Sequence, residues 1–177
     1  MTKVKNKGFF VYFIKLWLVL LIVLIGCTQS WEVNEMEMNV TSEFDMNGKI
    51  PEKYTCDGEE VNPPIYIEGI PVDAESLVLI MDDPDAPVGT FDHWIVWNIE
   101  PGNIEENSVP GVQGKNSFGK TAYGGPCPPS GEHRYFFKLY ALDTKLDLPE
   151  GSDKEAVEKA MEGHVVEMGE LIGLYSR

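Results

Sequence analysis

The sequence contains few cysteines, few histidines and few basic side chains. Only three of its 177 residues are cysteine, too few for a small domain held together mainly by disulfides. The 14 Lys and Arg residues are outnumbered by 29 Asp and Glu residues, and a net charge of −15 is unsuited to binding nucleic acid. The three histidines show no His-x-His or His-x-x-x-His spacing, and no Cys-x-x-Cys or Gly-x-Ser-x-Gly motif occurs. These absences disfavour a metal-dependent hydrolase and a serine hydrolase.

What is present fits one globular domain preceded by an N-terminal segment of different character. Hydrophobic residues make up 43% of the chain and charged residues 24%. The stretch Met1–Gly8 carries three lysines, and Leu16–Ile25 is a run of ten apolar residues that leads into the tetrad Leu24-Ile25-Gly26-Cys27. This is the layout of a signal peptide. The tetrad resembles a bacterial lipobox, in which a peptidase cuts before a cysteine that carries diacylglycerol.

The N-terminal pattern predicts a lipoprotein-type signal peptide at residues 1–26, a lipid-modified Cys27, an acidic tether at residues 27–37 and a folded domain at residues 38–177. The predicted location is outside the cytoplasm, anchored by lipid to the cell membrane, or to the outer membrane where one exists. A retained membrane span is the alternative, although the apolar segment contains Lys15 and falls short of about 20 apolar residues. Beyond residue 26 the chain has 10 basic and 29 acidic residues, a net charge of −19. Acyl chains rather than charge would therefore hold it at an anionic membrane.

Three short runs rich in β-branched and aromatic residues predict central strands. They are bounded by Gly, Pro, Asp or Asn and cover Ser76–Met81, His93–Ile99 and Tyr135–Leu142. Weaker strand signals cover Asn39–Phe44 and Pro64–Glu68. The sequence therefore predicts a mainly antiparallel β domain.

The last 26 residues have a different pattern. Ser152 and Glu155 form a capping-box motif, and apolar residues follow at helical spacing as far as Met168. This pattern predicts a C-terminal helix within residues 152–177 that packs against the edge of the β domain, with His164 on its apolar stripe.

Polar residues gather in three loops that flank the predicted central strands. The segment Asp82–Pro87 follows the first strand, and Pro84 restrains the carboxylates on either side of it. Asp92 and His93 begin the next strand, and Tyr123–Tyr135 precedes the third with two glycines and several prolines. Glycines expose backbone N–H groups and prolines stiffen the loop, a combination suited to binding an anion. Strand ends can bring the three loops together at one rim.

The sequences DDPDAP at Asp82–Pro87 and YGGPCPPSGEHRY at Tyr123–Tyr135, together with His93-Trp94, carry a family resemblance. Further matching stretches include Asn62-Pro63-Pro64 and Asn116–Gly119, in order, across residues 38–177. The chain resembles the phosphatidylethanolamine-binding protein family, also called the Raf kinase inhibitor protein family, and in particular its bacterial and archaeal branch.

The resemblance implies two antiparallel β-sheets with Greek-key connections and a small anion-binding pocket near one end. Members of the family bind phosphate, the phosphoryl head of phosphatidylethanolamine, nucleotides or acetate, and none has an established general reaction. The resemblance thus implies no catalytic residue, cofactor or metal. Carried over by position, the ligand-binding residues are Asp83, Asp85, His93, Gly124, Gly125, Pro126, His133 and Tyr135.

An anion in a domain of this charge needs a local positive group. His93 and His133 can supply it, because an imidazolium donates charge-assisted hydrogen bonds to a phosphate oxygen. Asp83 and Asp85 fit better as groups that orient a histidine or accept an ammonium. Arg134 alternates with His133 along a strand and is expected to point to the other face. The function predicted is non-enzymatic binding of phosphate, phosphoethanolamine or a similar head group.

Some questions stay open at this level. A docking inhibitor of a protein partner, such as a protease or kinase, is the alternative function, with the pocket regulatory or vestigial. Cys56 and Cys127 lie in loops next to the pocket motifs and are free to form a disulfide or to remain thiols. The segment Val88–Asp92 is short, which predicts a low pocket wall, and Ser117 replaces a common Asp and predicts a weaker loop contact.

Overall fold

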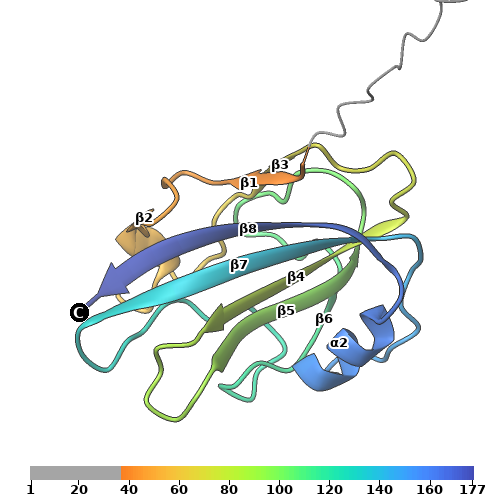
Figure 1. Cartoon of the computed structure of the whole chain (residues 1–177). Coiled ribbons are helices and arrows are strands. Elements are labelled where there is room, and N and C mark those ends of the chain that lie inside the picture. The colour runs from red at the N-terminus through yellow and green to blue at the C-terminus, as the bar shows by residue number, and fades with distance from the viewer. Residues whose placement is uncertain (1–36) are drawn as a thin grey trace, which may run out of the picture. The chain divides into compact units, whose positions relative to one another are not determined.

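The computed structural model describes residues 37–177, which form two β-sheets and one α-helix (Figure 1). The larger sheet has six strands in the order β2-β8-β7-β4-β5-β6. Their bounds are β2 Gly48–Lys49, β4 Ser76–Asp83, β5 Phe91–Ile99, β6 Val112–Gln113, β7 Glu132–Leu142 and β8 Val165–Ser176. The smaller sheet pairs β1, Asn39–Thr41, with β3, Tyr66–Glu68. A 3-10 helix, η1, covers Glu52–Tyr54, and the α-helix α2 covers Lys154–Met161.

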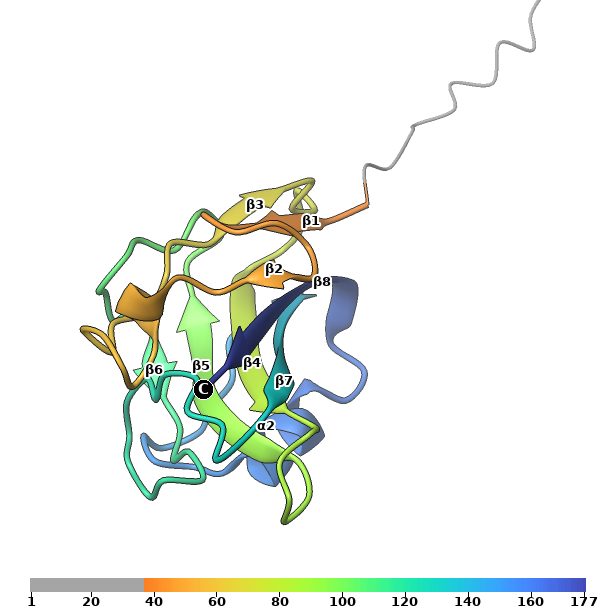
Figure 2. The ribbon, with the colours of Figure 1, turned by 90° about the vertical axis from the view of Figure 1, so that its left-hand side faces the viewer.

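Both faces of the larger sheet are covered, as Figure 2 shows with β1 and β3 on one side and α2 on the other. Strand β4 is buried along its whole length. Because successive side chains alternate across a strand, Leu77 and Leu79 join one core cluster while Val78 and Ile80 join the other. This two-sided burial explains why the central strands are continuous apolar runs in the sequence.

The predicted mainly β fold with two sheets and a helix is confirmed, and the three central strands extend slightly beyond their predicted bounds. The two weaker strand predictions correspond to the short strands β1 and β3. One pairing departs from the antiparallel expectation, because β2 runs parallel to β8. No helix in the described part of the chain is long and apolar enough to cross a membrane.

The predicted helix across residues 152–177 is wrong in extent. The helix ends at Met161, and β8 follows after a turn that contains Gly163 at a φ of 81°. Strand β8 pairs with β7 along almost its whole length, and from Gly169 onward its side chains are alternately buried and half-buried. That long-range pairing outweighs the local helical spacing. The helix cap is also shifted by one residue, since Asp153 accepts a hydrogen bond from the Ala156 N–H.

The register of the larger sheet brings the predicted polar loops to one end. Strand β4 ends at Asp83, which lies opposite Phe91 at the start of β5. Strand β7 begins at Glu132 beside the end of β4 and pairs there with the C-terminal end of β8. The predicted signal peptide at residues 1–26, the predicted lipidation site Cys27 and nearly all of the predicted tether lie outside the described residues.

Candidate functional site

A disulfide fixes the loop that precedes β7. Cys56, just after η1, bonds to Cys127, and the Cys56 N–H donates a hydrogen bond of 3.1 Å to the Pro126 carbonyl. Gly125 lies so close to this segment that an added Cβ would stand 2.7 Å from the Tyr54 carbonyl oxygen. The glycine and the disulfide together hold the loop firmly against η1, and the question left open by the sequence is answered in favour of a disulfide.

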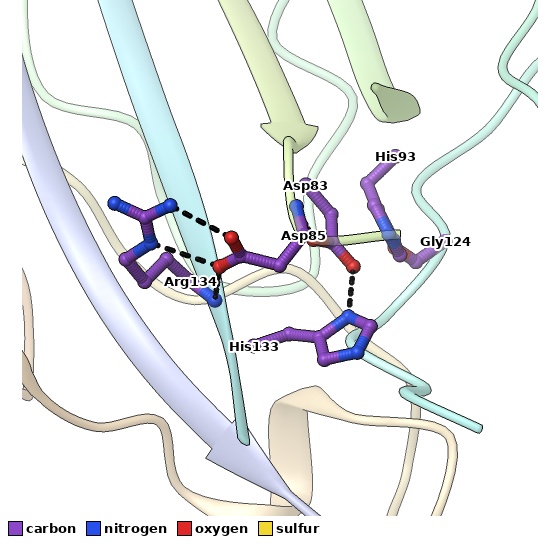
Figure 3. A network of polar contacts seen from close by, with 6 residues as sticks. All are labelled: Asp83, Asp85, His93, Gly124, His133 and Arg134. Carbon is purple, nitrogen blue, oxygen red and sulfur yellow. Dashed lines mark hydrogen bonds and ion pairs between the residues drawn. The ribbon is translucent and has the colours of Figure 1, made fainter. Parts of the chain in front are cut away.

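Asp83 orients His133. The Asp83 Oδ2 atom accepts a hydrogen bond of 2.7 Å from His133 Nδ1, while Oδ1 accepts one of 2.8 Å from the Asp85 N–H (Figure 3). Both side chains are nearly buried, with 4% of Asp83 and 9% of His133 exposed. Because both carboxylate oxygens already accept a hydrogen bond, Asp83 serves as the orienting group that the sequence suggested.

Asp85 points away from this pair. Its carboxylate accepts hydrogen bonds from Arg134 Nε at 2.8 Å, Nη2 at 2.7 Å and the Arg134 backbone N–H at 3.0 Å. The hydrogen bonds from Arg134 lower the pKa of Asp85 to about 2. Figure 3 shows the Asp85 side chain directed at Arg134 rather than at His133. Asp85 thus fastens its loop to β7 through an ion pair with Arg134.

His93 is buried and bonded to the loop before β7. Its Nδ1 lies 2.8 Å from the Gly124 carbonyl oxygen, and the Gly124 N–H donates back to the His93 carbonyl at 3.0 Å. A carbonyl can only accept, so Nδ1 carries the hydrogen. Burial lowers the pKa of His93, which favours the neutral ring. Burial therefore opposes the imidazolium that the sequence suggested for His93.

Tyr135 presents an unpaired hydroxyl. The residue is fully buried, and its ring meets the His93 ring edge-on at 5.2 Å between centroids. No hydrogen-bond partner for the hydroxyl exists among residues 37–177. Burial and the charge of Asp83 raise the pKa of Tyr135. The Cys127 backbone has a smaller, opposite effect on this pKa. The hydroxyl remains protonated near neutral pH and is a buried hydrogen-bond donor without an acceptor among the described residues.

A cavity of about 220 Å³ opens beside these groups. Its lining residues are Asp83, Ala86, Pro87, Val88, Phe91, His93, Phe118, Cys127 and Pro129. This volume lies below the range of about 300–1,000 Å³ typical of pockets for drug-sized ligands, so it suits a small head group. Val88 at the rim is 84% exposed, in keeping with the low wall predicted for its short loop.

The predicted site residues divide into three groups. Asp83 and His93 line the cavity, and His133 and Tyr135 contact those two residues. Asp85 is bonded to Arg134 outside the lining. The remaining three, Gly124, Gly125 and Pro126, support His93 and the disulfide from behind.

Sequence reasoning missed the apolar part of the lining. Phe91 and Phe118 meet edge-on at 4.7 Å between ring centroids, and both pack on His93. In the sequence, the only indication of this role is that Phe91 and Phe118 each stand next to a polar motif. Ser117 makes a loop contact of its own, because its hydroxyl accepts a hydrogen bond of 2.9 Å from the Asp92 N–H.

The third histidine is remote from the cavity. His164 lies in the turn after α2, where its Nδ1 is 2.8 Å from an oxygen of Asp143, and both side chains are about half exposed. It does not lie on a helix as predicted. In the described part of the chain, no group of three or more His, Cys, Asp and Glu side chains is arranged to hold a metal ion.

Fold and cavity together define a small β-sheet protein with a histidine-containing pocket at one end of its central sheet. The family model for phosphatidylethanolamine-binding proteins matches residues 40–176. The chain therefore belongs to the phosphatidylethanolamine-binding protein family.

Curated relatives and solved structures support this family membership. A UPF0098 protein of Methanothermobacter thermautotrophicus is 54% identical over 147 residues, which is 77% of this chain and 97% of the relative. A UPF0098 protein of Archaeoglobus fulgidus is 46% identical over 99% of this chain, which spans 62% of that longer relative. The crystal structure of a homologue from Chlamydia trachomatis has 42% identity and a TM-score of 0.77, covering 80% of this chain and 98% of its own. E. coli YbcL has 28% identity and a TM-score of 0.73, covering 80% and 99%.

Proposed function

We propose that the cavity binds a small phosphorylated anion, such as phosphate or phosphoethanolamine, without chemical turnover. The Asp83–His133 pair is the observation that carries this proposal. Because Nδ1 of His133 donates to Asp83, a protonated His133 has Nε2–H left to donate to a ligand oxygen. The Tyr135 hydroxyl adds a second, neutral donor with no partner inside the described protein.

The surroundings strengthen these hydrogen bonds. Most of the lining is apolar, and Asp83 and His93 are its buried polar members. A charge-assisted hydrogen bond is stronger where water is excluded. Asp83 balances the positive charge of a protonated His133, and a ligand ammonium would find the same carboxylate as a partner. A head group with both charges therefore suits the site better than a simple anion does.

Binding rather than catalysis fits the side chains around the cavity. None of its lining residues is a serine, threonine or lysine, and Cys127 is held in a disulfide. The lining therefore offers no hydroxyl, free thiol or amine as a nucleophile. The proposal includes the N-terminal prediction, in which a lipid on Cys27 anchors the domain outside the cytoplasm. The Cys56–Cys127 disulfide supports that location, since such bonds persist in oxidising compartments.

Replacement of His133 tests the proposal. We expect His133→Asn to reduce phosphoethanolamine affinity at least about tenfold, because a charge-assisted hydrogen bond contributes about 1.5–3 kcal/mol. His164→Asn is the matched control, because it removes an exposed histidine that also pairs with an aspartate. Unchanged affinity in His133→Asn, measured by calorimetry, would reject this function for the pocket.

A further inference from the structure

The polar groups of the lining are arranged as acceptors. Asp83 is a carboxylate, and its two oxygens already receive hydrogen bonds from His133 and the Asp85 N–H. His93 carries its ring hydrogen on Nδ1, which it donates to the Gly124 carbonyl. In a neutral ring that carries its hydrogen on Nδ1, the remaining nitrogen, Nε2, can only accept a hydrogen bond.

An oxyanion that carries no hydrogen is repelled by these hydrogen-bond acceptors. Its oxygen atoms and the Nε2 lone pair of His93 would face each other in a largely apolar cavity. Protonation of His93 would relieve the conflict, but burial makes that costly: the ring is 3% exposed and packed among Phe91, Phe118 and Tyr135. Burial lowers the pKa of His93 even though the Gly124 and Gly125 backbone and the charges on Asp83 and Asp92 act to raise it.

We infer that the pocket selects oxyanions that carry a hydrogen atom. These are phosphate or phosphonate groups with a P–O–H, which donates a hydrogen bond to His93 Nε2. This inference rests on the proposed function and specifies its ligand class. The other oxygens of the group accept from the Tyr135 hydroxyl and from His133. Sulfate and sulfonate groups have similar shape but carry no hydrogen near neutral pH, so the site rejects them.

The test compares methylphosphonate with methanesulfonate at pH 6, using the full-length protein in a non-ionic detergent. Both probes then carry one negative charge and have the same tetrahedral shape, but only the phosphonate has an O–H. Calorimetry should show at least about tenfold tighter binding of methylphosphonate, because a site built around a ligand hydroxyl penalises an analogue that lacks it. In His93→Gln, whose amide can donate, the ratio should fall toward one, while His164→Gln should keep it.

A second measurement does not depend on a folded variant. The nitrogen-15 resonances of the wild-type imidazole rings should show His93 as the neutral tautomer with hydrogen on Nδ1, in the ligand-free protein and in the phosphonate complex. Equal affinity for the two probes, or hydrogen on His93 Nε2 in the complex, would overturn the inference while leaving anion binding in place. Failure of both probes and of phosphoethanolamine to bind would reject the proposed function and the inference together.

Discussion

The disulfide between Cys56 and Cys127 allows a quantitative prediction of stability. The two cysteines are 71 residues apart, so the bond closes a long loop and restricts the unfolded chain. In the chain-entropy treatment, a loop of this length corresponds to about 4 kcal/mol at 25 °C. Reduction, or the pair of substitutions Cys56→Ser and Cys127→Ser, should therefore lower the free energy of unfolding by that amount. For a domain of this size the melting temperature should fall by roughly 10–20 °C.

The assay is urea unfolding of residues 38–177 with and without reductant, followed by tryptophan fluorescence. Trp94 and Trp97 are the tryptophans of this region and both are buried, so their emission shifts to longer wavelength on unfolding. Reduction should also weaken ligand binding, because Cys127 lines the cavity. An identical urea midpoint in both conditions would refute the reasoning, provided that thiol titration confirms complete reduction.

Three further predictions concern the pocket and its support. Asp83→Asn should weaken phosphoethanolamine binding at least about tenfold by removing the charge that orients a protonated His133, whereas Asp143→Asn should not, as a calorimetric comparison of the two variants will show. Gly125→Ala should destabilise the fold by about 1–3 kcal/mol, because its Cβ would stand 2.7 Å from a backbone oxygen; an unchanged urea midpoint would contradict this packing. The pKa of His93 is lowered by burial from its usual 6.5, so the unfolded chain takes up its proton first and stability should decline as the pH falls below about 6.5. That decline should be smaller in His93→Gln, and equal slopes of unfolding free energy against pH would argue against a buried neutral ring.

The central strands could be predicted from the sequence because both of their faces are buried, which makes each of them a continuous apolar run. Segments such as Ser76–Met81 are continuously apolar, and few other structures account for such a short run bounded by turn residues. Strand β8 could not be predicted in the same way. Its glycines at positions 169 and 173 lie against Met38 and Ile50 from distant parts of the chain, and its pairing with β7 is equally long-range.

The site was predictable where its chemistry is polar. The sequence placed Asp83, His93 and His133 in one site, and the structure brings them within contact of one cavity or of each other. The lowered pKa of His93 was not predictable, because it depends on burial by aromatic rings from other segments. Phe91 and Phe118 were missed because an apolar side chain in a loop has no chemical signature until its neighbours are known.

The most direct test of the account is calorimetric titration with phosphate and with phosphoethanolamine at pH 6 and pH 8. The wild-type protein should bind both saturably and more tightly at pH 6 than at pH 8, because the lower pH adds hydrogen to the phosphate oxygens of the ligand. The variant His93→Ala/His133→Ala should lose this binding, and His164→Ala should retain it. Absence of saturable binding by the wild-type protein at either pH would contradict the account and turn attention to a protein partner.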